Sequence, residues 1–205
     1  MFRWLSVFLV LSLFAMLPAS LPAQDKLVVF GGYSYLRPPV TVTETCPICA
    51  TPGVFDFTSH QNLNGWELSA TYRFLPFLGF AADFSGHYGP STSGYSSNVH
   101  QHTVLFGPEV SLPARVSPFA HVLFGVTHQS ISGANPNAIP VGAPSYLSVL
   151  AATNTDFATA FGAGIDLRLI PHVWIRPIQI DYLVTRLNNN TQSQPRVSAG
   201  VVLHF

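Results

Sequence analysis

Charged residues are scarce in this sequence of 205 residues, because Asp, Glu, Lys and Arg make up only 9% of it. Typical soluble domains carry about 25% charged residues. The hydrophobic fraction of 48% is ordinary, and nine basic residues balance nine acidic ones. No basic patch indicates nucleic-acid binding. So little charge would solvate a soluble domain poorly, whereas a protein whose surface faces lipid needs few charges.

Long apolar runs are confined to the amino terminus. Residues 1–23 combine one positive charge at Arg3, an apolar run from Leu5 to Leu17 and small residues that end at Ala23. This pattern is typical of a secretory signal peptide and is too short for a membrane-spanning helix. No later segment approaches the ~20 apolar residues of such a helix. Residues 24–205, which we expect to form one domain, must therefore use strands for any membrane insertion.

Cysteine is also rare, with only Cys46 and Cys49, in the motif Cys-Pro-Ile-Cys. A redox motif of this spacing needs a helix amino terminus to activate a thiol, and no helical pattern surrounds this one. Two thiols are also too few for a four-ligand zinc site. In an exported protein the pair predicts a local disulfide that braces a loop. No cofactor is predicted.

What the sequence does contain is a regular alternation, clearest in its last ten residues, Arg196 to Phe205. One face of this segment is apolar and the other is polar or small, with Val202 as the only exception. A period of two residues predicts a strand with one lipid-facing and one polar face. The apolar face consists of Val197, Ala199, Val201, Leu203 and Phe205, and the opposite face includes Arg196, Ser198, Gly200 and His204.

Seven further segments show the same period, so we expect an all-β fold, an eight-stranded antiparallel up-and-down transmembrane β-barrel. Short turns alternate with four longer connections, 38–64, 89–97, 131–154 and 188–194, which we expect outside the cell. Pro108 predicts a bulge or a local kink. Pro177 predicts a bulge, because Arg176 and Asp181 are an odd number of residues apart. The predicted strands are 26–37, 65–74, 78–88, 98–112, 119–130, 155–169, 173–187 and 196–205.

The alternating strands, the Gly-Gly-Tyr-Ser-Tyr segment at 31–35 and the terminal segment 197–205 resemble a family of small outer-membrane barrels. This family includes the OmpA transmembrane domain, OmpX and OmpW. The resemblance implies a place in the outer membrane of a Gram-negative-type bacterium, in contact with lipid and lipopolysaccharide. It also implies that the barrel-assembly machinery reads the closing strand, with Phe205 as sorting signal. The roles of the family vary, which implies a structural or surface-interaction role here.

Eight charged residues fall on the inward faces of the predicted strands, and Arg196 and His204 face the same lumen. An eight-stranded barrel is just wide enough for side chains to fill it, so these charges should pair across the interior. A buried charge without a partner would cost several kcal/mol. A narrow channel for small solutes is the alternative. The eight are Glu67, Arg73, Asp83, Glu109, Asp166, Arg168, Arg176 and Asp181.

Four histidines, His87, His100, His102 and His128, map to the outer ends of neighbouring strands. Imidazole is a common metal ligand, so a metal site at the rim is possible, but we favour polar rim residues without a ligand role.

One enzymatic pattern is present. The segment His128-Gln129-Ser130 resembles the His-x-Ser pair of outer-membrane lipid A deacylases, in which an acidic residue orients the histidine that activates the serine. Ile131 replaces the asparagine of that family, and no acidic residue follows before Asp156. We therefore expect no enzyme and no catalytic residue, with a lipid A-modifying hydrolase as a remote alternative.

Overall fold

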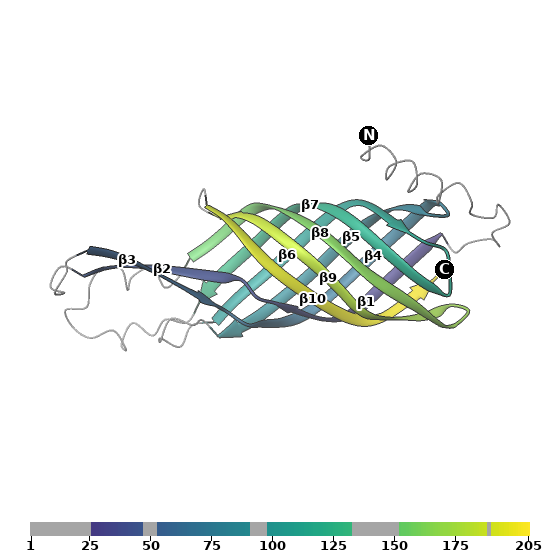
Figure 1. The fold of residues 1–205 in the computed structure, drawn as a ribbon, viewed down its shortest axis with the longest axis horizontal. Helices are drawn as coiled ribbons and strands as arrows, with labels where there is room; N and C mark the ends of the chain where they lie inside the picture. The colour runs from purple at the N-terminus through teal and green to yellow at the C-terminus, as the bar shows by residue number, and fades with distance from the viewer. Residues whose placement is uncertain (1–25, 47–52, 91–97, 133–151, 188–189) are drawn as a thin grey trace, which may run out of the picture.

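A computed structural model describes residues 26–46, 53–90, 98–132, 152–187 and 190–205. Eight strands close into an antiparallel barrel in the order β1-β10-β9-β8-β7-β6-β5-β4, while β2 and β3 form a separate two-stranded sheet. The β2–β3 hairpin projects beyond one end of the barrel (Figure 1). The strands are β1 (Leu27–Leu36), β2 (Pro39–Cys46), β3 (Gly53–His60), β4 (Leu63–Leu75), β5 (Leu78–Pro90), β6 (Asn98–Ser111), β7 (Val116–Ser132), β8 (Ala152–Ile170), β9 (Val173–Leu187) and β10 (Asn190–His204).

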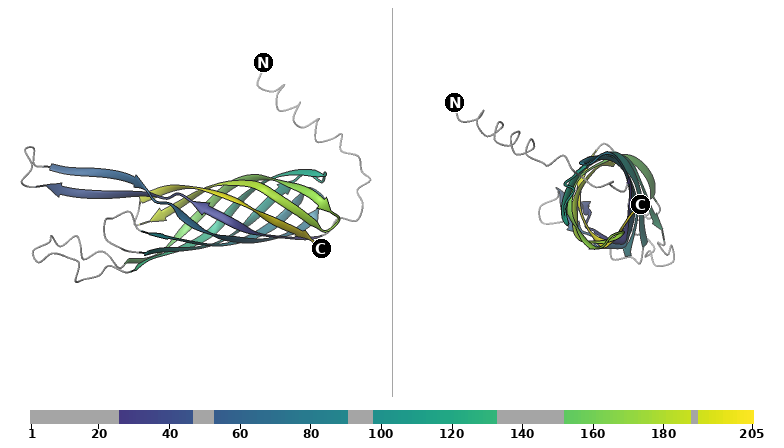
Figure 2. Two further views of the ribbon diagram at one scale, coloured as in Figure 1. Left: turned by 90° about the horizontal axis from the view of Figure 1, so that it is seen from below. Right: turned by 90° about the vertical axis from the view of Figure 1, so that its right-hand side faces the viewer.

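The alternation in sequence becomes the two faces of the barrel wall. In β4, the outward side chains of Trp66, Leu68 and Tyr72 are 45%, 48% and 54% exposed, while the intervening Glu67 and Thr71 are 1% and 3% exposed. The end view in Figure 2 shows the closed ring that separates these faces. An apolar outside around a polar inside is the arrangement of a membrane barrel. No helix among the described segments is long and apolar enough to cross a membrane.

The ring closes where β10 meets β1, along the strand that alternates most regularly. Phe205 donates its backbone N–H to Leu27 O at 2.8 Å and accepts a hydrogen bond from Leu27 N at 3.1 Å. Gly32 lies directly opposite Gly200, and a Cβ added to either would collide with the backbone of the other strand. The predicted closing strand is confirmed, and this seam requires glycine on both sides.

The two predicted bulges have opposite outcomes. The bulge at Pro177 is confirmed, because β9 contains one extra residue there relative to the paired segments of β8 and β10. As a result, Arg176 and Asp181 are both buried. Of the bulge or local kink predicted at Pro108, the bulge is wrong, because β6 keeps one register with β5 and with β7 on both sides of it, and the kink stays a prediction. Proline lacks an N–H, so it can leave out a ladder bond without an inserted residue.

Two of the predicted long connections are more ordered than expected. Residues 39–46 and 53–60, expected as parts of a loop without strands, pair as β2 and β3. The β-branched run Val40-Thr-Val-Thr43 favours an extended chain, but the prolines around it obscure the pattern. Residues 190–194, expected as loop, extend β10, which pairs with β9 up to Leu187. The predicted signal peptide, 1–23, lies outside the described residues.

Apolar side chains pack inside the barrel at both ends of its polar interior. At the end with the long connections, Leu36, Leu63 and Val99 belong to a buried apolar cluster. At the end with the short turns, a second cluster consists of Val28, Phe30 and Val202, with Trp174 packed against it. Charged and polar groups between them are therefore held away from water.

Candidate functional site in the barrel lumen

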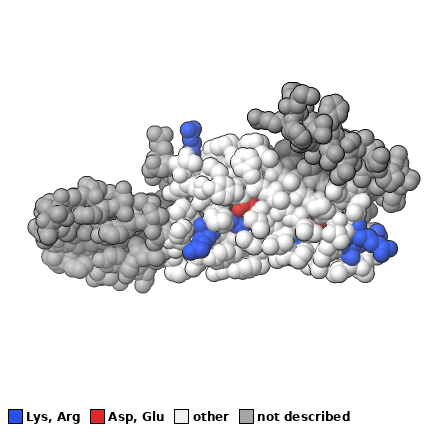
Figure 3. Space-filling model, in the orientation of Figure 1, with Lys and Arg blue, Asp and Glu red and all other residues white. Residues whose placement is uncertain are grey.

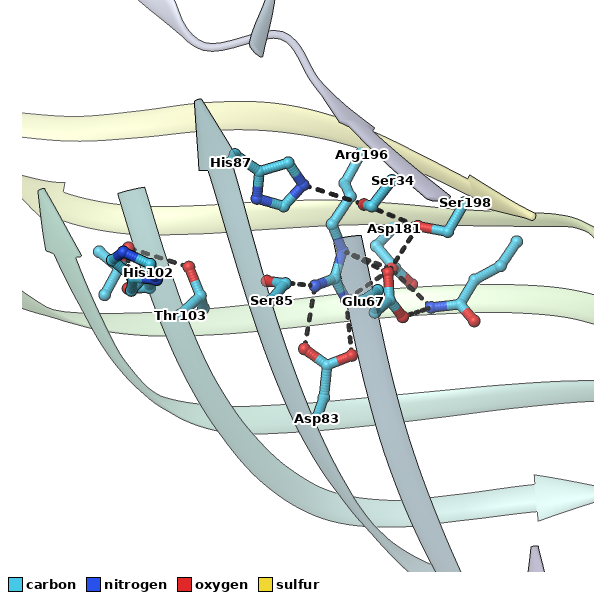
Figure 4. A network of polar contacts seen from close by, with 12 residues as sticks. Ser34, Glu67, Asp83, Ser85, His87, His102, Thr103, Asp181, Arg196 and Ser198 are labelled. Carbon is cyan, nitrogen blue, oxygen red and sulfur yellow. Dashed lines mark hydrogen bonds and ion pairs between the residues drawn. The ribbon is translucent and has the colours of Figure 1, made fainter. Parts of the chain in front are cut away.

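The centre of the lumen is the guanidinium of Arg196, which is 0% exposed. Its Nη1 donates to Asp83 Oδ1 at 2.9 Å, and its Nη2 lies 2.7 Å from Asp181 Oδ2. These carboxylates come from β5 and β9, so one side chain of β10 joins well-separated parts of the wall (Figure 4). Buried ion pairs persist only when such additional bonds satisfy the charges.

Glu67 is the third carboxylate near Arg196, with its Oε2 at 3.5 Å from Nε. Ser198 Oγ donates to Glu67 Oε2. Gln179 Nε2 donates to Glu67 Oε1 at 2.7 Å and to Asp181 Oδ2 at 2.8 Å. The amide of Gln179 and the guanidinium of Arg196 therefore bridge these acidic side chains.

His121 extends the network along β7. Its Nε2 lies 2.9 Å from Asp181 Oδ1, and its Nδ1 lies 3.9 Å from Glu109 Oε2. Thr71 Oγ1 also donates to Glu109, at 3.3 Å. The room for the imidazole comes from Gly162, where an added Cβ would meet both Asp181 Oδ1 and His121 Nε2. The contact between His121 and Asp181 therefore depends on a glycine at this position of β8.

Arg176 forms a second centre nearer the short turns. Its Nε and Nη2 donate to both oxygens of Asp166, at 2.7 and 3.0 Å, and its Nη1 donates to Gln179 at 2.6 Å. The rings of Phe30 and Phe119 lie over the guanidinium, with centroids 4.4 and 4.0 Å from Cζ. Gln179 thus links this centre to that of Arg196.

Not every predicted lumen charge reaches these centres. Six of the predicted residues are buried in the lumen, whereas Arg73 is half-buried and Arg168 is exposed, so the placement of Arg168 in the lumen network is wrong. Arg168 keeps the inward register, opposite Arg115 and Trp174, but it lies at the end of the barrel, where its side chain reaches solvent. The buried six are Glu67, Asp83, Glu109, Asp166, Arg176 and Asp181.

Three members of the network were not among the eight predicted charges. Arg196 was assigned to the lumen face, and His121 occupies an inward position of its strand, so alternation alone could have included both. His121 also lies opposite Glu109 in the β6–β7 register, a pairing that the sequence does not reveal. Gln179 carries no charge, so a search for charged residues on the inward faces could not identify it.

The four rim histidines do not all lie on the same face of the barrel wall. His87 is buried inside, with its Nε2 2.9 Å from Ser34 Oγ, whereas His102 and His128 are exposed and face each other across β6 and β7. His100 and His102 both contact the ring edge of Tyr88. Within the described ranges no three His, Cys, Asp or Glu side chains could hold a metal ion. A rim site built from all four histidines is therefore wrong.

The His-x-Ser pattern lacks an acidic orienter where one would be needed. His128 Nδ1 lies 2.7 Å from Thr155 Oγ1 on β8. Ser130 lies opposite His100 in the register. A threonine hydroxyl supplies no charge to stabilise an imidazolium, so this arrangement gives no support to a hydrolase.

The predicted disulfide and the sorting signal keep their status as predictions. Cys49 lies outside the described residues, and Cys46 ends β2. Phe205 is 62% exposed on the outer face.

No family model and no curated protein sequence matches the chain. Solved structures do. Neisserial surface protein A has a TM-score of 0.59 at 13% identity, covering 90% of this chain and all (100%) of that one. OprG, an outer-membrane protein of Pseudomonas aeruginosa, has a TM-score of 0.54 at 12% identity, covering 87% and 95%. Ail of Yersinia pestis has a TM-score of 0.51 at 15% identity, covering 88% and 99%. The predicted fold class, the small eight-stranded barrel of outer-membrane proteins, is confirmed.

Proposed function

We propose that this chain, with the fold of the small outer-membrane barrels, is an integral outer-membrane protein with a closed lumen and a structural or surface-interaction role. The barrel would anchor the protein, and the connections at one end would face the cell exterior. The observation that carries the proposal is the fully buried Arg196, bonded to carboxylates of β5 and β9 across the interior.

A second hydrogen bond crosses the lumen at another height along the barrel axis and supports a closed lumen. Gln101 Nε2 of β6 donates to Gln194 Oε1 of β10 at 2.9 Å. Each of these strands lies four places from the other around the eight-stranded ring, so the bond spans its full width. Both side chains are buried. Eight strands leave space for side chains alone, which agrees with a filled interior.

The β2–β3 hairpin supports a role at the cell surface. It extends past the barrel at the end that carries the longer connections (Figure 2). Two barrels of similar fold are a Neisserial surface protein and an attachment invasion locus protein, the second also solved with a heparin analogue. We infer that the connections of this chain contact surface molecules. Lipopolysaccharide and the barrel-assembly machinery are the other partners that this location implies.

Epitope insertion tests this orientation. A tag inserted between residues 49 and 50, in the β2–β3 connection, should be detected by antibody on intact cells. A matched tag between residues 171 and 172, in the short β8–β9 turn, should be detected only after the outer membrane is opened. The reverse pattern would contradict the proposal.

A narrow channel is the second candidate, favoured by polar side chains such as Thr103, Thr127 and Thr185 inside the wall. Vesicle swelling in a small sugar distinguishes the two. We expect vesicles that contain the folded protein to swell no faster than empty ones. Rapid swelling would favour the channel.

A further inference from the structure

Among the side chains whose burial is described, every exposed charged residue is basic, and no Asp or Glu is exposed. In the view of Figure 3 the blue atoms of Lys and Arg gather mainly towards the two ends, and most of the surface between them is white. The exposed charged side chains are Lys26, Arg37, Arg115, Arg168 and Arg186.

Arg115 and Arg168 lie side by side at the end with the short turns. Arg168 N donates to Arg115 O at 3.0 Å, and the next pair inward is Val116 with Leu167. Like charges at opposed positions of a ladder destabilise it. No carboxylate among the described residues forms an ion pair with either guanidinium. The pair therefore has an uncompensated double positive charge.

The lipid-facing side of the wall beside this pair is apolar. Leu112, Val116 and Leu169 are 40%, 56% and 59% exposed, and Ile170 is 57% exposed. Arg115 and Arg168 alternate with Val116 and Leu169, so each stem starts on the lumen side of the rim. At the end of the barrel a long arginine stem can extend past the apolar edge and keep its guanidinium at the level of lipid headgroups. The planar guanidinium fork also matches phosphate oxygens. Charge and apolar surface together fit a molecule with an anionic head and apolar chains.

We propose that Arg115 and Arg168 bind the phosphate of an anionic phospholipid in the inner leaflet of the outer membrane. This inference rests on the orientation proposed above, which places the short turns on the periplasmic side. Arg37 and Arg186 carry the same charge at the opposite end. Arg37 follows β1 and Arg186 lies in β9, and these two strands are separated by β10 in the ring. They provide the matched control.

Lipid retention measured by native mass spectrometry tests the site. The folded full barrel, in detergent, is offered phosphatidylglycerol, phosphatidylcholine or lipid A at equal concentration. A surface arginine near an anionic membrane contributes about 1 kcal/mol, or roughly fivefold in affinity. We expect phosphatidylglycerol to be preferred over phosphatidylcholine, and R115Q/R168Q to lower this preference by roughly an order of magnitude. The control R37Q/R186Q should keep it.

Each other outcome overturns the inference. Equal preference in R115Q/R168Q would place the lipid elsewhere, and equal loss in the control would indicate a general charge effect. Lipid A retained at the same arginines in place of phosphatidylglycerol would assign them to the other leaflet. Heat-dependent migration in gels reports the closed barrel separately. If the protein is folded and the tags show the expected orientation, a negative lipid result removes only this site.

Discussion

The two arginines inside the barrel and the two at its short-turn end differ in burial and in the groups that they contact. Arg176 and Arg196 are 3% and 0% exposed, and carboxylates bind each of them. Arg115 and Arg168 are exposed and lie beside each other. Arginine therefore stabilises the lumen by binding carboxylates in one place and, in the other, presents to solvent a positive charge that is unpaired among the described residues.

This difference shows how the barrel uses its few charges. A guanidinium inside the lumen cannot exchange its partner for water, so loss of the arginine leaves carboxylates buried without compensation. A guanidinium at the membrane surface remains solvated, and its loss costs little folding free energy. Substitutions at the two locations should consequently separate stability from lipid binding.

The largest effect is expected for Arg196→Leu. It removes the cation shared by Asp83, Asp181 and Glu67. Uncompensated buried charge typically costs about 3 to 5 kcal/mol. Urea unfolding in lipid vesicles, followed by tryptophan fluorescence, measures the free energy of unfolding. Arg196→Lys, which keeps the charge, should lose less, and an unchanged midpoint in Arg196→Leu would contradict the account.

Gly162→Ala should have the next largest effect, since the new methyl group would displace Asp181 or His121. Overpacking of this kind costs about 1 to 3 kcal/mol. The same unfolding measurement applies. Gly31→Ala is the matched control, because its Cβ would meet nothing nearer than Leu68 Cδ1 at 3.9 Å. Equal midpoints for the two variants would show that the space at Gly162 is not needed.

Arg176→Lys should be milder. Lysine keeps the positive charge near Asp166 but loses the bidentate hydrogen bond and the stacking of the planar guanidinium on Phe30 and Phe119. A desolvated cation–π contact contributes about 2 kcal/mol, and lysine retains part of it, so we expect a loss of about 1 to 2 kcal/mol. A more stable Arg176→Lys variant would argue against the stacked arrangement.

The smallest effect on stability is expected for R115Q/R168Q. Surface substitutions usually change the free energy of unfolding by less than about 0.5 kcal/mol. The unfolding midpoint in phosphatidylcholine vesicles should therefore match that of the unaltered protein. A loss comparable to that of Arg176→Lys would mean that these arginines also hold the fold.

Alternation in the sequence was sufficient to predict the barrel, because lipid outside and a filled lumen impose a period of two on every strand. It also located the Pro177 bulge, since Arg176 and Asp181 could not otherwise both face inward. Alternation does not show where the lumen ends: Arg168 keeps the inward register but reaches solvent at the end of the barrel. It also cannot identify partners: Arg196 meets Asp83 only because the ring closes, over a separation of 113 residues. The placement of His121 likewise depended on the bare backbone at Gly162.

Single-channel recording on the unaltered protein in planar bilayers tests the closed lumen most directly. The proposed closed lumen rests on the bonds of Arg196 to Asp83 and Asp181 and of Gln101 to Gln194, which would leave ions no continuous water-filled path. We predict a current no different from that of a protein-free bilayer over the full voltage range. Steady, large openings by the folded protein would contradict the account.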